Sequence, residues 1–218
     1  MELKELLYRR QSIRRFTSDD VANDDLREII DAARVAPSEK NLQNWHFIAI
    51  KSKELIDRIA EAVRARNEEI SSLMEPAEKE RADKFRKFVG RFTLFFTEAP
   101  VLIVVMVKGC IPTGYAEYEL AGADPSKGEE LLKRDPAIQS IGAAVENLTL
   151  RAFDLGYGLC WLSSANYAAD SIEAIVRKNA GFDKDGYFMA ALLALGVPEE
   201  GAKSPQKKDL SEIWTLVE

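Results

Sequence analysis

Two apolar runs constrain the fold of this chain more than any other feature. They cover residues 99–107 and 188–197, and both are too short to cross a bilayer as helices. The first contains the sequence VLIVVMV directly after Pro100, and its β-branched side chains show no polar alternation. Such a run is typical of a central strand that is covered on both faces. On this pattern alone, the covering layers fit a parallel, doubly wound sheet.

Helical and strand patterns alternate around these runs. Helical spacing predicts helices over 24–36, 137–155 and 170–179, and a long helical region over 53–97 that Pro76 must break. Asn23, Ser52 and Asp135 stand where the regions over 24–36, 53–97 and 137–155, respectively, would begin and be capped. Further strands are expected at 46–50, 159–162 and 187–197. No composition break marks a linker, so residues 1–218 are interpreted as a single α/β domain.

Two further features bear on the fold and on the site: a segment without periodicity and a stripe of phenylalanines. Residues 108–134 are rich in Gly, Pro, Tyr and Glu without periodicity, which predicts an irregular excursion and a candidate lid. Five phenylalanines recur at three- and four-residue spacing, and core or subunit contact is a better expectation for them than cofactor binding; they are Phe85, Phe88, Phe92, Phe95 and Phe96.

Charge and cysteine content narrow the class of protein. The net charge of −6 and the pI near 5.1 argue against nucleic-acid binding and against an anionic membrane surface. Cys110 and Cys160 are far apart in the sequence, which favours two reduced thiols and a cytoplasmic protein. No Cys/His/Asp spacing indicates a metal site.

The chain offers few catalytic side chains. His46 is its only histidine, and we expect it to be structural. There is no GxGxxG turn, no GxxxxGK[ST] phosphate loop and no nucleophile elbow. We therefore expect no catalytic side chain, because a bound cofactor would carry out the chemistry.

An arginine cluster near the N-terminus suggests an anion site. Arg9, Arg10, Arg14 and Arg15 surround Ser12 in the stretch YRRQSIRRF. Guanidinium groups match phosphate oxygens two at a time. Basic residues after a helix also complement its dipole and form a solvated face, which is the preferred interpretation for this stretch taken alone.

Several motifs together resemble the FMN-dependent nitroreductase family. They occur in the order RRQSIRRF, APSEKNLQNWHF, GAAVENLTLRAFDLGYGLCWL, LLALGVPEE and KKDL. The resemblance implies an α+β sandwich with a mostly antiparallel, mixed sheet between helices, in place of the doubly wound arrangement. It also implies an intertwined homodimer with FMN at the interface and a C-terminal segment that reaches the partner.

The resemblance assigns cofactor contacts position by position. Arg10 and Ser12, with Gln11 between them, match the phosphate-binding stretch, and Arg14 matches the basic residue near the flavin's pyrimidine edge. Backbone N–H groups after the CWL strand face the central flavin ring. The remaining matches are Ser163 and Ser164 in that turn, Pro37, Ser38, Glu39 and Asn41 in a loop from the partner subunit, and Lys207 in the tail with Lys208 or Lys203 as substitutes.

This chain departs from the family pattern in the partner loop. Asn44 stands where many members have proline, and Glu39 stands where a small residue is common. A carboxylate at Glu39 would oppose charge on reduced flavin unless Arg14 or a partner arginine screens it.

The implied activity is a ping-pong transfer. NADH or NADPH reduces FMN, which then reduces electron-poor acceptors such as nitroaromatics or quinones. A specialised FMN enzyme, either a reductive dehalogenase or a flavin-destroying oxygenase, is an alternative, and its mark would be an ordered lid contributing Tyr115, Glu117 or Tyr118. A non-turnover flavin store or redox sensor and a cofactor-free interaction domain are further alternatives.

Overall fold

A four-stranded antiparallel sheet forms the centre of the computed structural model, which describes residues 2–201 and 205–217. The strands follow the order β1-β2-β4-β3, and every neighbouring pair is antiparallel. β2 lies inside the sheet, and its first seven residues are buried, which confirms the covered central strand. The antiparallel pairing shows that the parallel, doubly wound alternative is wrong. The strands are β1 (Trp45–Ile50), β2 (Val101–Lys108), β3 (Gly158–Leu162) and β4 (Tyr187–Gly196).

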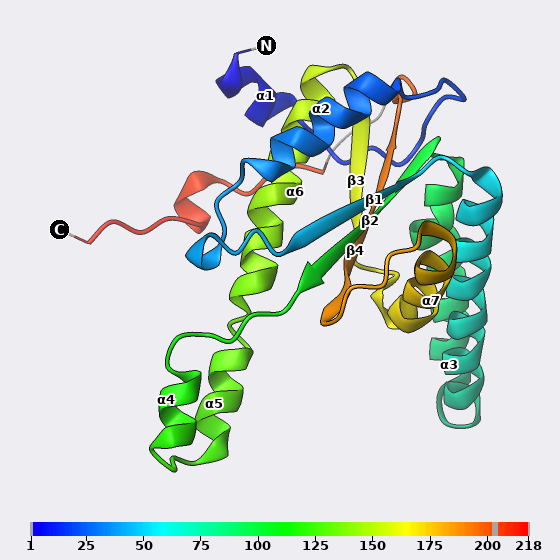
Figure 1. Cartoon of the computed structure of the whole chain (residues 1–218). Helices are drawn as coiled ribbons and strands as arrows, with labels where there is room; N and C mark the ends of the chain where they lie inside the picture. The colour runs from blue at the N-terminus through cyan, green and yellow to red at the C-terminus, as the bar shows by residue number, and fades with distance from the viewer. Residues whose placement is uncertain (1, 202–204, 218) are drawn as a thin grey trace.

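Helices cover both faces of the sheet (Figure 1). On one face α2 (Asn23–Arg34) and α6 (Pro136–Asp154) share an apolar core with one set of strand side chains. On the other face α3 (Lys53–Phe88) and α7 (Ala169–Ala180) share a second core with the opposite set. The predicted inner face of α6 is fully buried at Ile141, Ala144, Val145, Leu148 and Ala152. The α+β sandwich is therefore confirmed.

The long helix α3 is a hairpin of two helical arms (Figure 1). The Ser52 hydroxyl caps its start by accepting from the Leu55 N–H at 3.3 Å. Helical geometry fails at Glu78, with φ −144° and ψ 63°, so the break that Pro76 requires falls two residues later. Arg86 on the second arm donates to Glu68 on the first at 2.8 Å. Short turns η2 (Val89–Thr93) and η3 (Leu94–Glu98) then lead into β2.

Residues 108–134 do not form an irregular excursion. They contain α4 (Tyr115–Leu120) and α5 (Pro125–Leu132), which pack on one another and project from the sheet layers (Figure 1). Asp124 caps α5 by accepting from the Ser126 N–H at 2.9 Å. The prediction was wrong because helices of 6 and 8 residues are too short to display a clear period.

A smaller correction concerns the start of α2. Asn23 does not cap this helix but is its first residue. Its side-chain oxygen accepts from the Lys51 ammonium at 3.2 Å, and Lys51 also pairs with Asp20 at 2.7 Å. Asp135, in contrast, caps α6 as expected by accepting from the Ile138 N–H at 3.1 Å.

The N-terminal segment extends the sheet beside β3. After α1 (Leu3–Arg9), Ser12 bridges Leu159 and Phe16 bridges Pro198. Gly158 permits this approach, because a Cβ there would lie 2.6 Å from the Ile13 side chain. The segment is thus held against the end of the sheet where Arg14 lies.

The C-terminal tail leaves the body of the molecule (Figure 1). It contains one short turn, η5 (Leu210–Glu212), and its apolar side chains are exposed at Leu210, Ile213, Trp214, Leu216 and Val217. Among the described residues, the search for helices with the length and apolarity of a membrane span found none.

Candidate functional site

A cleft of about 390 Å³ opens where β3 ends and the N-terminal segment passes beside it. Pockets of about 300–1,000 Å³ commonly hold small ligands. Three predicted site residues, Arg14, Ser163 and Ser164, meet here, although they lie in distant parts of the sequence. The cleft is lined by Arg14, Phe88, Phe92, Phe95, Cys160, Trp161, Leu162, Ser163 and Ser164. We call it the flavin cleft, after the expectation, implied by the family resemblance, that Arg14, Ser163 and Ser164 contact a flavin.

The turn after β3 is fixed from two sides. The buried hydroxyl of Thr93 donates to Ser164 Oγ at 3.0 Å. The Asn166 N–H donates to the Ser163 carbonyl at 3.1 Å. Because both serines are held to the scaffold, this turn can present backbone groups to a ligand with little motion.

Successive side chains of the extended N-terminal segment point to opposite sides of the chain. Ser12 and Arg14 both lie near the Cys160 thiol. Burial raises the pKa of this thiol, whereas the Arg14 charge and a hydrogen bond with the Ser12 side chain lower it. Gln11 and Ile13 instead line a different cavity of about 370 Å³. Residues two apart in an extended chain share a side, so Gln11 is not brought together with Arg14.

The other arginines of the cluster have carboxylate neighbours. Arg10 Nε lies 3.4 Å from a Glu146 oxygen on α6, and its side chain is only 22% exposed. Arg9 pairs with Glu5 at 2.6 Å, and Arg15 lies 3.8 Å from Glu199. The solvated interpretation of the cluster therefore fits Arg9 and Arg15, whereas Arg10 is partly enclosed.

The phenylalanine stripe divides between two environments. Phe96 is fully buried, and Phe85 packs against Tyr167 with ring centroids 5.5 Å apart, which confirms the core expectation for these two. Phe88 and Phe92 are 46% and 48% exposed, and with Phe95 they line the flavin cleft. Sequence reasoning missed this wall. The 88, 92, 95 spacing would place three rings on one face of a continuous helix, but it gives no signal of their exposure, and these residues fall in α3, η2 and η3.

A second and larger cleft of about 720 Å³ adjoins the flavin cleft. The two share Arg14, Phe92 and Phe95 as lining residues. Its further lining residues are Arg15, Arg64, Gly90, Arg91, Leu94, Thr97 and Glu98. Four guanidinium groups face one carboxylate around this opening, so its charge favours anions.

The predicted partner loop is built into the opposite side of the molecule. Residues Glu39–Asn41 form the turn η1, and the Glu39 N–H donates to Ser140 on α6 at 3.1 Å. The Ser38 hydroxyl accepts from the Gln43 N–H at 3.0 Å. α6 covers the sheet face that is remote from α3 and α7. One chain therefore does not bring this loop, which begins at Pro37, together with the flavin cleft.

The loop is held in an unusual backbone conformation. Lys40, Asn41 and Gln43 have φ of 48°, 54° and 47°, a region that side chains adopt at a cost and that often marks functional loops. Lys40 Nζ lies 3.5 Å from the Glu39 carboxylate and screens its charge. Asn44, which stands at the family's proline position, donates its side-chain N–H to the Lys108 carbonyl.

The two described tail lysines lie in solvent. Lys207 and Lys208 are exposed, and neither forms an ion pair within residues 2–201 and 205–217. Lys203 lies outside the described residues. The same described ranges hold no group of three or more His, Cys, Asp or Glu side chains that could bind a metal ion.

Comparison with known proteins agrees with this fold. A family model described as the nitroreductase family matches residues 7–197. A protein named "Putative NADH dehydrogenase/NAD(P)H nitroreductase" from Methanothermobacter thermautotrophicus is 33% identical over 212 residues, which cover 96% of this chain and 83% of the relative.

Solved structures give the same result. A BluB-like flavoprotein from Clostridium difficile 630 superposes with a TM-score of 0.96 at 48% identity and full coverage of both chains. A nitroreductase with bound FMN from Desulfitobacterium hafniense DCB-2 shares the fold with a TM-score of 0.71 at 24% identity, covering 99% of this chain and 97% of that one. With its antiparallel sandwich and a family match over most of its length, the chain belongs to the nitroreductase family.

Proposed function

We propose that this protein is an FMN-dependent NAD(P)H oxidoreductase that works as a homodimer. Residues 1–218 form one FMN-binding domain, and electron-poor acceptors such as nitroaromatics or quinones are reduced in a ping-pong cycle. The observation that carries this proposal is the flavin cleft, where Arg14, the Ser163–Ser164 turn and three phenylalanines converge.

The donors and surfaces present in the chain fit FMN. A flavin ring needs a flat apolar slot, which the wall of Phe88, Phe92 and Phe95 supplies. The phosphate needs guanidinium groups, and Arg10 is partly enclosed with only a loose carboxylate neighbour at 3.4 Å. Within the described ranges Arg14 forms no ion pair, so its charge is available to a ligand.

When bound, FMN would accept a hydride from the nicotinamide donor and pass electrons to the second substrate. Arg14 lines the cleft with a positive charge, which would stabilise negative charge on the pyrimidine edge of a reduced flavin bound there. The backbone N–H groups of Ser163 and Ser164 orient the central ring. The phenylalanine wall excludes water from the face where the substrates stack.

The dimer completes the site with groups that one chain keeps apart. The loop from Pro37 to Asn41 faces away from the flavin cleft of its own chain. The Asn41 side-chain oxygen accepts from the Gln43 side chain at 3.1 Å, which leaves its amide N–H groups to donate to a ligand. The exposed apolar tail supports the same arrangement, because large apolar patches are rarely left in water.

The experiment uses the purified protein and its own colour. We expect a yellow dimer that binds one FMN per chain and whose flavin is bleached by NADH or NADPH under anaerobic stopped-flow mixing. Nitroaromatics or quinones added afterwards restore the oxidised spectrum. Protein that fails to bind added FMN contradicts every flavin function proposed for this chain. Bound FMN that neither nucleotide bleaches would leave a flavin store or sensor.

A specialised flavoenzyme is the second candidate, because the solved structure at 48% identity is that of a BluB-like flavoprotein. The ordered α4–α5 arm also supports it. Glu117 is engaged in capping Gly114 at 3.0 Å, and Tyr115 packs at Gly128, so Tyr118 at 39% exposure is the side chain left for a ligand. Mass spectrometry of the flavin after repeated reduction in air discriminates: intact FMN supports the reductase, and cleaved flavin supports a flavin-destroying oxygenase.

A further inference from the structure

The larger cleft beside the flavin cleft carries an unusual concentration of positive charge. We call it the cationic cleft and define it by Arg14, Arg15, Arg64 and Arg91. Arg64 comes from the first arm of α3 and Arg91 from η2, whereas Arg14 and Arg15 come from the N-terminal segment. Elements that are distant in sequence therefore place guanidinium groups around one opening of about 720 Å³.

These charges are largely unneutralised. Among residues 2–201 and 205–217, Arg14, Arg64 and Arg91 form no ion pair, while Arg15 has only a 3.8 Å contact with Glu199. Arg91 lies over the Phe92 ring at 5.1 Å, an arrangement that leaves its N–H donors available. The chain carries 36 acidic and 30 basic residues, so a carboxylate partner is not in short supply. Unpaired guanidinium groups in such a chain indicate a place for an external anion.

The flavin cleft and the cationic cleft are joined by a shared aromatic wall. Phe92 and Phe95 line both, so a ligand with a flat ring in the flavin cleft can extend past them toward Arg64 and Arg91. Small acceptors such as quinones are neutral and compact and need no second compartment of this size. A nicotinamide dinucleotide has a flat ring, a pyrophosphate and a long remainder, which matches an aromatic compartment followed by a cationic one.

We propose that Arg64 and Arg91 bind the pyrophosphate of the nicotinamide dinucleotide donor. This inference rests on the proposed function, because it places the donor ring over FMN. Both NADH and NADPH carry the pyrophosphate, so the cleft serves either donor. The guanidinium groups act on binding and orientation only, and the hydride passes from the nicotinamide ring to the flavin without a proton from either arginine.

Three variants of the holoprotein test the proposal: Arg64→Gln, Arg91→Gln and the double variant. In anaerobic stopped-flow reduction each single variant is expected to raise the dissociation constant for NADH and for NADPH roughly tenfold. The double variant raises both further, and the reduction rate at saturating donor stays within about twofold. Calorimetry with NAD⁺ on the oxidised holoprotein should show the same loss without any turnover.

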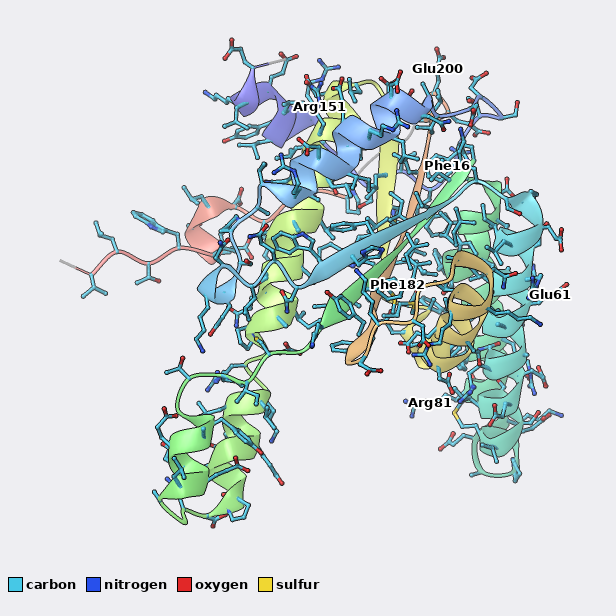
Figure 2. All side chains as sticks on the ribbon, in the orientation of Figure 1. Phe16, Glu61, Arg81, Arg151, Phe182 and Glu200 are labelled. Carbon is cyan, nitrogen blue, oxygen red and sulfur yellow. The ribbon has the colours of Figure 1, made fainter. Side chains whose placement is uncertain are left out.

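Two controls separate this proposal from damage to the site. Arg81→Gln changes an exposed arginine near the turn of the α3 hairpin (Figure 2), and its donor affinity should equal that of the wild type. A synthetic N-benzyl dihydronicotinamide carries no phosphate, so it should reduce all variants at the wild-type rate. FMN content, read from absorbance, should also be unchanged.

The outcomes are distinguishable. Donor affinity that is unchanged in the double variant overturns the proposal, as does an equal loss with the phosphate-free donor. A change confined to the apparent affinity for the acceptor overturns it in favour of an anionic acceptor. Wild-type holoprotein that no nicotinamide donor reduces overturns the proposed function itself, and the inference with it.

Discussion

The flavin cleft and the loop from Pro37 to Asn41 are two parts of one predicted site, yet the chain places them on opposite faces of its sheet. The flavin cleft lies between β3 and the α3 layer, whereas the loop is fastened to Ser140 on α6. Both are well anchored by hydrogen bonds. This separation within one chain is the reason why the proposed function requires a homodimer, in which the loop of one copy would complete the flavin cleft of the other.

The largest expected effect falls on the proposed phosphate contact at Arg10, which lies beside Glu146 on α6 and is not among the residues that line the flavin cleft. Arg10→Ala should weaken FMN binding by roughly 2–5 kcal/mol if the phosphate contact is enclosed, because the side chain is only 22% exposed and has one loose carboxylate neighbour. Fluorescence titration of the apoprotein with FMN measures this. Arg9→Ala is the matched control, since Arg9 is paired with Glu5 in solvent, and equal affinities for the two variants would remove Arg10 from the site.

The next largest effect is expected where the N-terminal segment packs against β3. In Gly158→Ala the added Cβ would lie within 2.6–2.8 Å of three Ile13 side-chain atoms, so Ile13 must shift and carry Ser12 and Arg14 with it. Overpacking of this kind costs about 1–3 kcal/mol of unfolding free energy, measurable by urea denaturation, and FMN affinity should fall as well.

Gly109→Ala provides the control for that substitution. Its Cβ would meet only Phe188 at an ordinary 3.8 Å, so stability and FMN affinity should stay near the wild-type values. If Gly158→Ala is equally silent, the N-terminal segment does not depend on close approach to β3.

A smaller effect is expected at the pyrimidine edge. Arg14→Ala removes a positive charge from beside the reduced ring, so the flavin potential should fall. A charge at about 4 Å contributes roughly 1–4 kcal/mol between full solvent screening and a protein-like dielectric, which is about 20–90 mV for a two-electron couple. A spectroelectrochemical titration measures the shift. Arg15→Ala should leave the potential in place, and a fall as large as that of Arg14→Ala would contradict the assignment.

The smallest expected effect is the contribution of His46 to the pH dependence of stability, and His46 belongs neither to the flavin cleft nor to the loop from Pro37 to Asn41. His46 stacks on Phe182 with ring centroids 4.5 Å apart, and burial, helped by the Lys184 charge, lowers its pKa from the usual 6.5. Its neutral form is favoured in the folded state, so this contribution to stability is present above pH 6.5 and is lost as pH falls through the lowered pKa.

Because His46 is the only histidine, NMR can follow its pKa directly. Lys184→Ala should raise this pKa while leaving it below 6.5, since burial is the larger cause. Addition of FMN should not move it, and a clear shift on FMN binding would place the flavin near β1 instead of β3.

The sequence was sufficient for the regular parts of the fold. The apolar run of β2 has no polar alternation and predicted a strand covered on both faces, and the apolar face of α6 predicted a buried helix. The structure confirms both predictions. It was insufficient for α4 and α5, whose 6 and 8 residues carry too few turns for a period. The break in α3 was foreseen from Pro76, but its position at Glu78 depends on how the two arms pack.

The site was less predictable than the fold, for two physical reasons. Phe88 and Phe92 show the same spacing as the partly buried Phe85 and the fully buried Phe96, and exposure cannot be read from spacing when one helical region turns into short η2 and η3. Whether Asn41 reaches the flavin cleft of its own chain or that of a partner depends on how two copies pack. The sequence of one chain does not give the distance between two copies.

Complementation between two defective chains tests the shared site most directly. One chain carries Arg10→Ala and the other carries Ser38→Ala with Asn41→Ala, and differently tagged copies are purified as heterodimers. The account predicts that each defective homodimer loses FMN, whereas the heterodimer binds one FMN, because one of its two sites combines an intact Arg10 with an intact loop from the other chain. A heterodimer that binds no more FMN than its parents, or a loop variant that keeps full FMN by itself, would contradict it.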